Sequence, residues 1–408
     1  MSFQTGLSGL NASSRSLDVI GNNIANANTT GMKASRTEFS DLVAASLGAA
    51  KSVNAGLGVM VSAVSQQFSQ GSISSTGNNL DVAINGGGFF QLKQPDDTLA
   101  YTRDGSFKLD KDGFLKTNGN ANVMGYPTDA TGKASSSTLE KLQLPTNSPI
   151  GASQTTQINA AFNLDARAKV AADVTPPTPT TTYSTSLVAY DSQGVEVPVT
   201  LNFVKITPTT VNGVSFDTWD VFANNDTATA NFKMTFDANG KLTSPTGTTS
   251  LTLTSPNPSV GQFPVNLDVS KATQYGTSFA VSDLTQDGYT SGDLTGMSIG
   301  DDGVISARYS NGQTQSKGKL VLADFRNTQG LMPLGGNAWS ATLASGEAVQ
   351  GSPGTGKFGA LRSGALEDSN VDLTSELVNM MTAQRAYQAN AQTIKTQDQV
   401  MSTLVNLR

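Results

Sequence analysis

Large apolar residues recur at helical spacing at the two ends of the chain. Near the N-terminus they stand at Phe3, Leu7, Leu10, Leu17, Ile20 and Ile24. Near the C-terminus they follow alternating steps of four and three through Leu373, Leu377, Met380, Gln384, Tyr387, Ala391, Ile394, Asp398, Met401 and Val405. Eight of those ten positions are apolar, which is typical of a coiled-coil seam. We therefore predict helices over about 1–27 and 365–408 that pack against each other, because neither stripe can be buried within its own helix.

The N-terminal helix carries glycines that should weaken it. Gly6, Gly9 and Gly21 each cost up to about 1 kcal/mol relative to alanine. We expect this helix to form only when it is packed. The stretches 28–70 and 351–364 are expected to connect the helices to the middle of the chain.

A period of two replaces the helical period in the middle of the chain. Leu80, Val82 and Ile84 alternate with polar or small residues, and Asp-Gly pairs at 104–105, 112–113 and 302–303 mark turns. We predict a first β domain whose strands begin near Leu80, pause near Pro145 and resume from about Gly288 to Ala360, with one strand at 304–309.

A second β domain is expected to be inserted between these two stretches. Apolar residues alternate from Val195 to Phe203, where Pro198 suggests an edge strand, and again from Phe232 to Phe236 before a turn at 237–240. The predicted fold class is therefore multidomain and mainly β, with two nested antiparallel β domains. The N- and C-terminal helices add an α-helical coiled-coil domain, so both termini lie at one end.

Composition excludes several classes of function. The net charge is −6 with no run of Lys or Arg, so we expect no nucleic-acid partner. No cysteine or histidine is present, which removes disulfides and catalysis through thiolate or imidazole. No apolar stretch approaches the length of a membrane span, and the first charge is Arg15, so we expect neither membrane insertion nor a cleavable signal peptide.

Candidate catalytic and binding motifs are weak. The sequence GSPGTGK at 351–357 lacks the Ser or Thr that a P-loop needs next, since Phe358 follows, and a loop is the better interpretation. The calcium-like run at 110–113 fits a hairpin turn better. Trp219 and Trp339 are predicted to be core residues. We expect no catalytic residue, cofactor or metal site, although carboxylate pairs of a glycosidase are not excluded by spacing.

The terminal helices have two interpretations. They could simply cap a monomer, or they could drive assembly. Polar residues at seam positions, here Gln384 and Asp398, more often set register in an assembly. We therefore favour assembly.

Several motifs resemble those of the bacterial flagellar rod and hook proteins. They occupy 8–12, 17–28, 30–33, 80–90, 101–107, 364–373, 384–391 and 404–408. The motif residues of interest are Asn22, Asn23, Asn26, Gly31, Gly88, Phe89, Phe90, Arg103, Gly105, Phe107, Glu367, Asn370, Gln384 and Arg385. Met32 stands where this family usually has an aromatic residue.

The resemblance implies a structural subunit, not an enzyme, that self-assembles into the flagellar hook, a curved tubular joint that transmits torque. Its implied partners are further copies of itself, the distal rod protein, the hook cap, the hook–filament junction protein and the flagellar type III export apparatus. The implied location is extracellular. The resemblance also implies the bounds of the domains: terminal helices at 1–27 and 365–408, connectors at 28–70 and 351–364, a first β domain at 71–147 and 286–350, and an outer β domain at 148–285. A rod or hook-associated subunit of the same family, and a secreted surface adhesin, are the alternatives; the large inserted domain argues against a rod subunit.

Overall fold

A computed structural model describes residues 2–42, 58–129, 131–145, 149–171, 183–211, 214–223 and 230–406. The chain divides into two compact units. Unit 1 contains 1–146, 296–308 and 314–408, and unit 2 contains 147–295 and 309–313. Unit 2 is therefore an insertion in unit 1.

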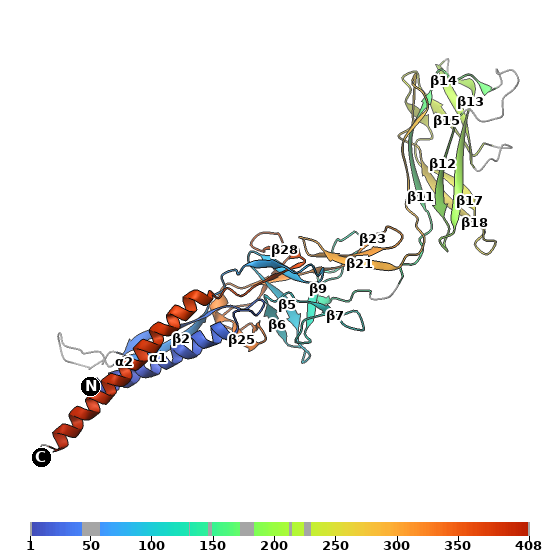
Figure 1. Cartoon of the computed structure of the whole chain (residues 1–408). Helices are drawn as coiled ribbons and strands as arrows, with labels where there is room; N and C mark the ends of the chain where they lie inside the picture. Colours follow the sequence, from blue (N-terminus) through green and yellow to red (C-terminus); the bar gives the residue numbers. More distant parts are fainter. Residues whose placement is uncertain are drawn as a thin grey trace. The chain divides into compact units, whose positions relative to one another are not determined.

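The two helices of unit 1 are α1 (Ser2–Ala25) and α2 (Leu373–Asn406), which lie side by side in Figure 1. They run antiparallel, because Gly6 faces Ile394 while Asn23 bonds to Glu376. α2 is ten residues longer, 34 against 24, and its C-terminal turns extend beyond the start of α1.

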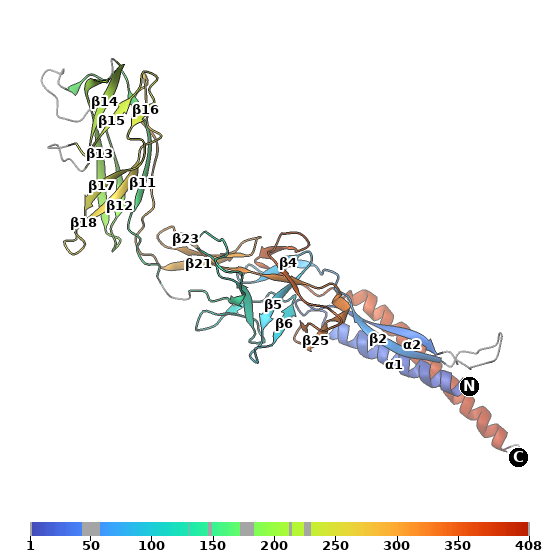
Figure 2. The ribbon, with the colours of Figure 1, turned by 180° about the vertical axis from the view of Figure 1, so that it is seen from behind.

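Two strands also lie against α1. β1 (Ser35–Leu42) and β2 (Gly58–Gln66) pair antiparallel, within the stretch for which the sequence suggested an extended connector. The backbone at Gly58 approaches α1 so closely that a Cβ there would collide with the Ser8 hydroxyl. Figure 2 shows both strands alongside the helix pair. The β propensity of Val59, Val61 and Val64 explains why the connector becomes a sheet.

The β body of unit 1 is one large sheet with two small ones. The small sheets pair β3 (Ile73–Ser75) with β29 (Ala365–Glu367) and β4 (Val82–Asn85) with β28 (Ala360–Ser363). The large sheet contains β5 (Phe89–Lys93), β6 (Leu99–Thr102), β7 (Lys108–Leu109), β8 (Leu115–Lys116), β9 (Asn122–Tyr126), β10 (Glu140–Lys141), β21 (Leu294–Ile299), β22 (Val304–Tyr309), β23 (Thr314–Leu320), β24 (Leu322–Asp324), β25 (Met332–Gly335), β26 (Ala338–Ser340) and β27 (Val349–Gly351). A 3₁₀ turn, η2 (Thr328–Gly330), precedes β25. Phe90, Phe107 and Ile305 are among the buried residues in the apolar core of this β body.

Unit 2 is a sandwich of two five-stranded sheets. One contains β11 (Gln157–Asp165), β17 (Thr249–Thr254), β18 (Gln262–Asp268), β19 (Thr273–Tyr275) and β20 (Ala280–Gln286). The other contains β12 (Tyr183–Tyr190), β13 (Glu196–Val211), β14 (Val214–Ala223), β15 (Phe232–Phe236) and β16 (Leu242–Ser244). Phe162 from the first sheet packs on Phe203 from the second, in one apolar core. The sheets are not wholly antiparallel, because β11 pairs parallel with β18 and β19.

Several predicted strands have the expected bounds. β22 covers 304–309, β15 covers 232–236, and Gly113 closes the β7–β8 turn with a positive φ of 81°. Trp219 and Trp339 are both buried. Pro198 lies in β13, which has a strand on each side and is therefore not an edge strand as a whole. The part of β13 that contains Pro198 nevertheless pairs with β12 alone, because β14 pairs with β13 only from Leu201 onward.

Candidate functional site

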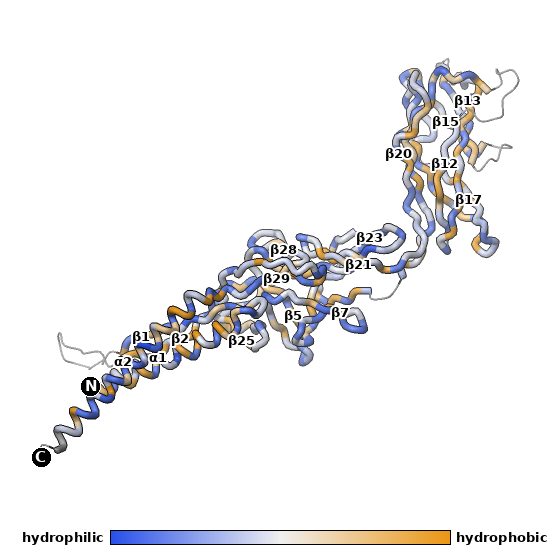
Figure 3. Tube along the Cα trace, in the orientation of Figure 1, coloured by the Kyte–Doolittle hydropathy of each residue, from blue (hydrophilic) through white to orange (hydrophobic). Residues whose placement is uncertain are grey.

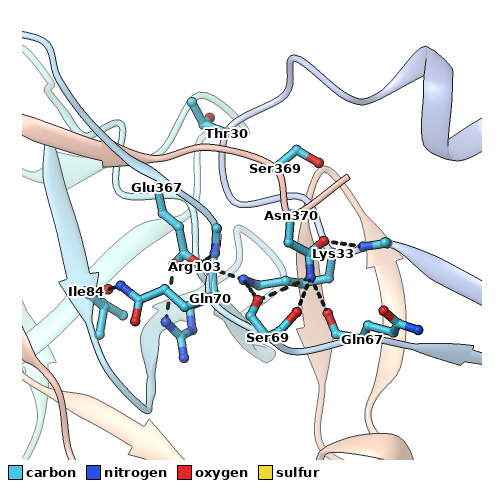
Figure 4. Close-up of polar contacts among 12 residues, drawn as sticks. Thr30, Lys33, Gln67, Ser69, Gln70, Ile84, Arg103, Glu367, Ser369 and Asn370 are labelled. Atoms are coloured by element: carbon cyan, nitrogen blue, oxygen red, sulfur yellow. Dashed lines mark hydrogen bonds and ion pairs between the residues drawn. The ribbon is translucent and has the colours of Figure 1, made fainter. Parts of the chain in front are cut away.

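The most unusual chemical feature of unit 1 is a buried carboxylate at the end of β29. The Glu367 side chain is fully buried, and its Oε1 accepts hydrogen bonds from Lys33 Nζ at 2.6 Å and from the Gly71 N–H at 3.0 Å. Its Oε2 lies 3.2 Å from Arg103 Nη1. We call Lys33, Arg103 and Glu367 the ionic junction (Figure 4). It ties three distant segments together in the interior.

Lys33 enters the ionic junction from the segment that follows α1. Its amino group, 1% exposed, also donates to the Ser69 carbonyl at 2.8 Å. Just before it, the Gly31 N–H donates to the Glu367 carbonyl at 2.8 Å. Gly31 has φ of 69°, and a Cβ there would lie 2.5 Å from the Asp104 nitrogen, so only glycine fits.

Arg103 follows β6 and brings the β body into the ionic junction. Its guanidinium carbon lies 5.3 Å from the centre of the Phe89 ring. Burial lowers the pKa of both the Lys33 amino group and the Arg103 guanidinium, and the hydrogen bond and charge of Glu367 oppose that shift. Glu367 is thus the group that compensates both cations.

Two asparagines hold the backbone on either side of the ionic junction. Asn370 Oδ1 accepts from the Ala34 N–H at 2.7 Å, and its Nδ2 donates to the Gln67 carbonyl at 2.7 Å. Asn23, which is buried in α1, accepts from the Ser35 N–H at 2.9 Å and donates to the Ser35 carbonyl at 2.8 Å. Each side-chain amide forms hydrogen bonds with backbone N–H and C=O groups, as the backbone of a neighbouring strand would.

The contact between the two helices is made largely by small residues of α1. A Cβ on Gly6 would lie 3.2 Å from Ile394, and one on Gly9 would lie 2.8 Å from the Asn390 amide. The glycines predicted to weaken α1 therefore let α2 approach closely. Gly21 is different, since a Cβ there would meet nothing within 4 Å.

The predicted apolar stripe of α1 lies mostly off this contact. Ile20 is buried, whereas Phe3 and Leu7 are exposed and Leu10, Leu17 and Ile24 are half-exposed. The contact follows a neighbouring row of the helix through Gly6, Gly9 and Asn23. Between them, Ser13, Ser16 and Ile20 line a cavity together with Ala383 and Ala386 of α2. Within the single chain, α2 therefore covers only part of the stripe, because small residues make the contact; that the stripe is a self-assembly seam stays a prediction.

The predicted seam of α2 is only partly covered. Met380, Ala391 and Ile394 are half-buried, while Leu373, Leu377, Tyr387 and Met401 are exposed. Val378, Met381 and Val400 add to this exposed apolar surface. The Val405 side chain lies outside the part of the chain that the structure describes. Figure 3 shows apolar positions along both helices.

The remaining motif residues fall into three groups. Asn22 and Asn26 close the end of α1, where Asn26 Nδ2 donates to the Asn22 carbonyl at 2.9 Å. Gly88, Phe90, Gly105 and Phe107 belong to the β body: Phe90 and Phe107 pack edge to face at 5.0 Å, Gly88 has φ of 112°, and a Cβ on Gly105 would collide with the Val82 carbonyl. Gln384 and Arg385 are exposed on α2, away from the ionic junction.

Sequence reasoning missed the ionic junction itself. Glu367, Arg103, Gly31 and Asn370 were marked as motif residues without a role, and Lys33 was not singled out. No pattern of spacing or charge in the sequence links these three segments, so the ionic junction follows only from the fold.

Other candidate chemistry finds little support in the fold. Residues 352–359 form turns between β27 and β28, so a strand follows the P-loop-like sequence where a phosphate site needs a helix. Within the described ranges, no group of three acidic residues is placed to hold a metal ion. Among the residues that the structure describes, no helix is long and apolar enough to cross a membrane.

Matches to known sequence families cover most of the chain and define its class. Residues 3–33 match the family described as flagella basal body rod protein, and 362–407 match the flagellar basal body rod FlgEFG protein C-terminal family. Residues 83–166 match the flagellar hook protein FlgE/F/G D1 domain, and 163–289 match the flagellar basal body protein FlaE D2 domain. The class is that of the flagellar axial proteins.

Full-length relatives identify one family within this class. The chain is 40% identical to the flagellar hook protein FlgE of Escherichia coli, over all of both chains. It is 35% identical to that of Treponema pallidum, over all of this chain and 99% of the other. The crystal structure of Helicobacter pylori flagellar hook protein FlgE2 aligns with a TM-score of 0.57 at 16% identity, covering 72% of this chain and all of the other, which supports the fold. The chain belongs to the flagellar hook protein family.

Proposed function

We propose that this chain polymerises into the hook, a curved tube that carries torque while it bends. The observation that carries the proposal is the incomplete burial of the helix pair. Leu377, Val378 and Met381 of α2 are each about half exposed although both helices are packed together. Burying the exposed half of such a side chain stabilises by about 1 kcal/mol, so these side chains favour contact with further copies.

The overhang of α2 strengthens the proposal. Asn23 bonds to Glu376 and Gly6 faces Ile394, so the first residues of α1 lie near 398. Val400 and Met401 lie beyond that point and are exposed, at 48% and 55%. These turns of α2 need another helix to cover them. Open head-to-tail contacts of this kind build helical tubes.

We assign the parts of the tube as follows. The helices, 1–27 and 365–408, form the inner assembly domain, and 28–70 with 351–364 couple it to the β body. The β domains at 71–147 with 286–350 and at 148–285 form the outer part. Their Thr-, Ser- and Asn-rich surfaces suit wet contacts that can re-form as the tube bends.

The same proposal includes the partners of this chain and its location. We infer contacts with the distal rod, the hook cap, the hook–filament junction and the type III export apparatus, and an extracellular position in the flagellum. The chain acts mechanically and catalyses no reaction. Family membership supports these assignments.

A pair of variants tests the assembly surface. Leu377→Asp with Met381→Asp places charge on the exposed apolar face without touching the residues that face α1. We expect loss of tubes in electron microscopy with the β units still folded by circular dichroism. Gln392→Asp adds charge at an exposed polar position of the same helix and should leave tubes intact. Normal tubes from the double variant would reject the assigned surface.

A genetic test addresses the function as a whole. Flagellar bases from cells lacking this chain should end at the rod, with hooks restored by re-expression. Hooks without filaments would assign the chain to the hook–filament junction, and complete flagella would favour the adhesin.

A further inference from the structure

The contact between α1 and α2 does little by itself to fix how far one helix lies along the other. Its α1 side is built of small residues such as Gly6 and Gly9, which present no shape for a partner to lock into. On α2, Ile394 lies opposite Gly6 and Asn390 lies opposite Gly9. Helical positions seven residues apart share a face, so Tyr387 and Met380 lie in line with Ile394, and Ala383 and Gln397 lie in line with Asn390. A slip of seven residues, about 10.5 Å, would therefore put equivalent faces together again.

The segment that leads into α2 is, by contrast, anchored at several atoms. Glu367 bonds through both carboxylate oxygens and through its carbonyl, which accepts from the Gly31 N–H. Three residues later, Asn370 binds the Ala34 N–H and the Gln67 carbonyl. The segment 31–34 follows directly from α1, so the end of α1 and the start of α2 are held by the same group of contacts.

These anchors are intolerant of displacement because they are buried and charged. Lys33, Arg103 and Glu367 are each at most 5% exposed. If α2 slipped, Lys33 and Arg103 would lose in the interior the one carboxylate that both contact, which is far more costly than exchanging one apolar seam contact for another. Buried polar groups are known to set register in helical assemblies.

We propose that Glu367 is a positioning residue that sets the axial register of α2 against α1. The ionic junction then fixes the length of α2 that overhangs α1, and with it the surface offered to a second copy. Only this last consequence rests on the proposed function; the register itself is a property of the single chain.

The absence of cysteine makes the register measurable with engineered disulfides. Gly9→Cys with Asn390→Cys reports the observed register, because a Cβ on Gly9 would lie 3.0 Å from the Asn390 Cγ. Gly9→Cys with Ala383→Cys, or with Gln397→Cys, reports a slip of seven residues in either direction. Oxidation of the full chain at low concentration, followed by non-reducing gels, separates bonds within one chain from bonds between chains.

With the ionic junction intact, we expect only the 9–390 disulfide. In Glu367→Gln, we expect the 9–383 or 9–397 disulfide to form at least tenfold faster than with the junction intact. Asp110→Asn, which breaks the ion pair with Lys116 on the β7–β8 hairpin, is the matched control and should change nothing. A folded Glu367→Gln chain that still forms only the 9–390 disulfide would overturn the proposal.

A second variant and a separate assay distinguish failure of the register role from failure of folding or of tube formation. If Glu367→Gln fails to fold, Lys33→Met combined with Glu367→Gln removes one buried cation and carries the same crosslinking test; failure of both to fold would make Glu367 a requirement of the whole fold and overturn the register role. Tube formation is scored independently by electron microscopy. A chain with an intact junction that forms no tubes would reject the proposed function and leave the register result standing.

Discussion

The amino group of Lys33 and the carboxylate of Glu367 lie 2.6 Å apart in the interior of unit 1, although 334 residues separate them in the sequence. Arg103 completes the contact from a third segment. The helices and the β body therefore share one charged centre, which makes it a place where a single substitution has a large effect.

Glu367→Gln should lower the free energy of unfolding by about 3–5 kcal/mol, since it leaves Lys33 and Arg103 buried without compensation. Urea unfolding followed by circular dichroism measures the loss. Arg36→Gln breaks the exposed pair with Glu38 and should cost at most about 1 kcal/mol. Equal small losses from the two variants would contradict the importance assigned to burial.

Two alanine substitutions in α1 should act in opposite directions. Gly21→Ala has free space around the new methyl group and should stabilise the helix by up to about 1 kcal/mol. Gly9→Ala places a methyl group against the Asn390 amide and should lose part or all of that gain. Thermal melts of helical content compare the two. The same gain from both would show that α2 does not approach α1 at Gly9.

Unit 2 should be sensitive to acid through Asp191. Burial, the largest influence, would raise the pKa of this carboxyl, but hydrogen bonds from the Ser255 hydroxyl and from the Val195 and Gln193 N–H groups outweigh it and hold the pKa below its ordinary value. A carboxyl with a depressed pKa contributes stability above its unfolded pKa of about 3.9 and loses it as the pH falls through the folded value.

The stability of unit 2 should therefore fall as the pH drops below about 4. Asp191→Asn keeps the shape of the side chain but cannot titrate, so it should lower stability at pH 6 and flatten the dependence between pH 6 and pH 3. Thermal unfolding at both values provides the comparison. An unchanged slope in the variant would show that other groups dominate the acid response.

Unit 2 should be removable without loss of unit 1. Its two connecting segments lie side by side, with the Ile150 N–H donating to the Gly292 carbonyl at 2.8 Å. Deleting 151–291 and joining the segments by a short turn should leave a chain that forms tubes of altered curvature. Electron microscopy would show wild-type curvature if unit 2 has no part in bending.

The sequence predicted strands and turns well where apolar and polar residues alternate regularly. The strand at 304–309 and the turn at 237–240 follow from alternation and from Asp-Gly or Asn-Gly pairs, which act over a few residues. The face used by α1 was misjudged because glycine and serine give no hydrophobic signal, yet they are what permits close approach of Ile394 and Asn390.

The ionic junction could not be predicted by pattern. Nothing within ten residues of Lys33 distinguishes it from a surface lysine, and its partner lies on β29 at the far end of the chain. The resemblance marked Glu367 and Arg103 as motif residues, but only the pairing of β3 with β29 brings Glu367 within reach of both cations.

The long separation between Lys33 and Glu367 also has a consequence in time. A ribosome makes Lys33 early and Glu367 only after nine-tenths of the chain, so the nascent N-terminal segment carries a cation that it cannot yet bury. Contacts between such distant residues form late and slowly. A product that ends before Glu367 therefore lacks the carboxylate that pairs with Lys33 in the interior.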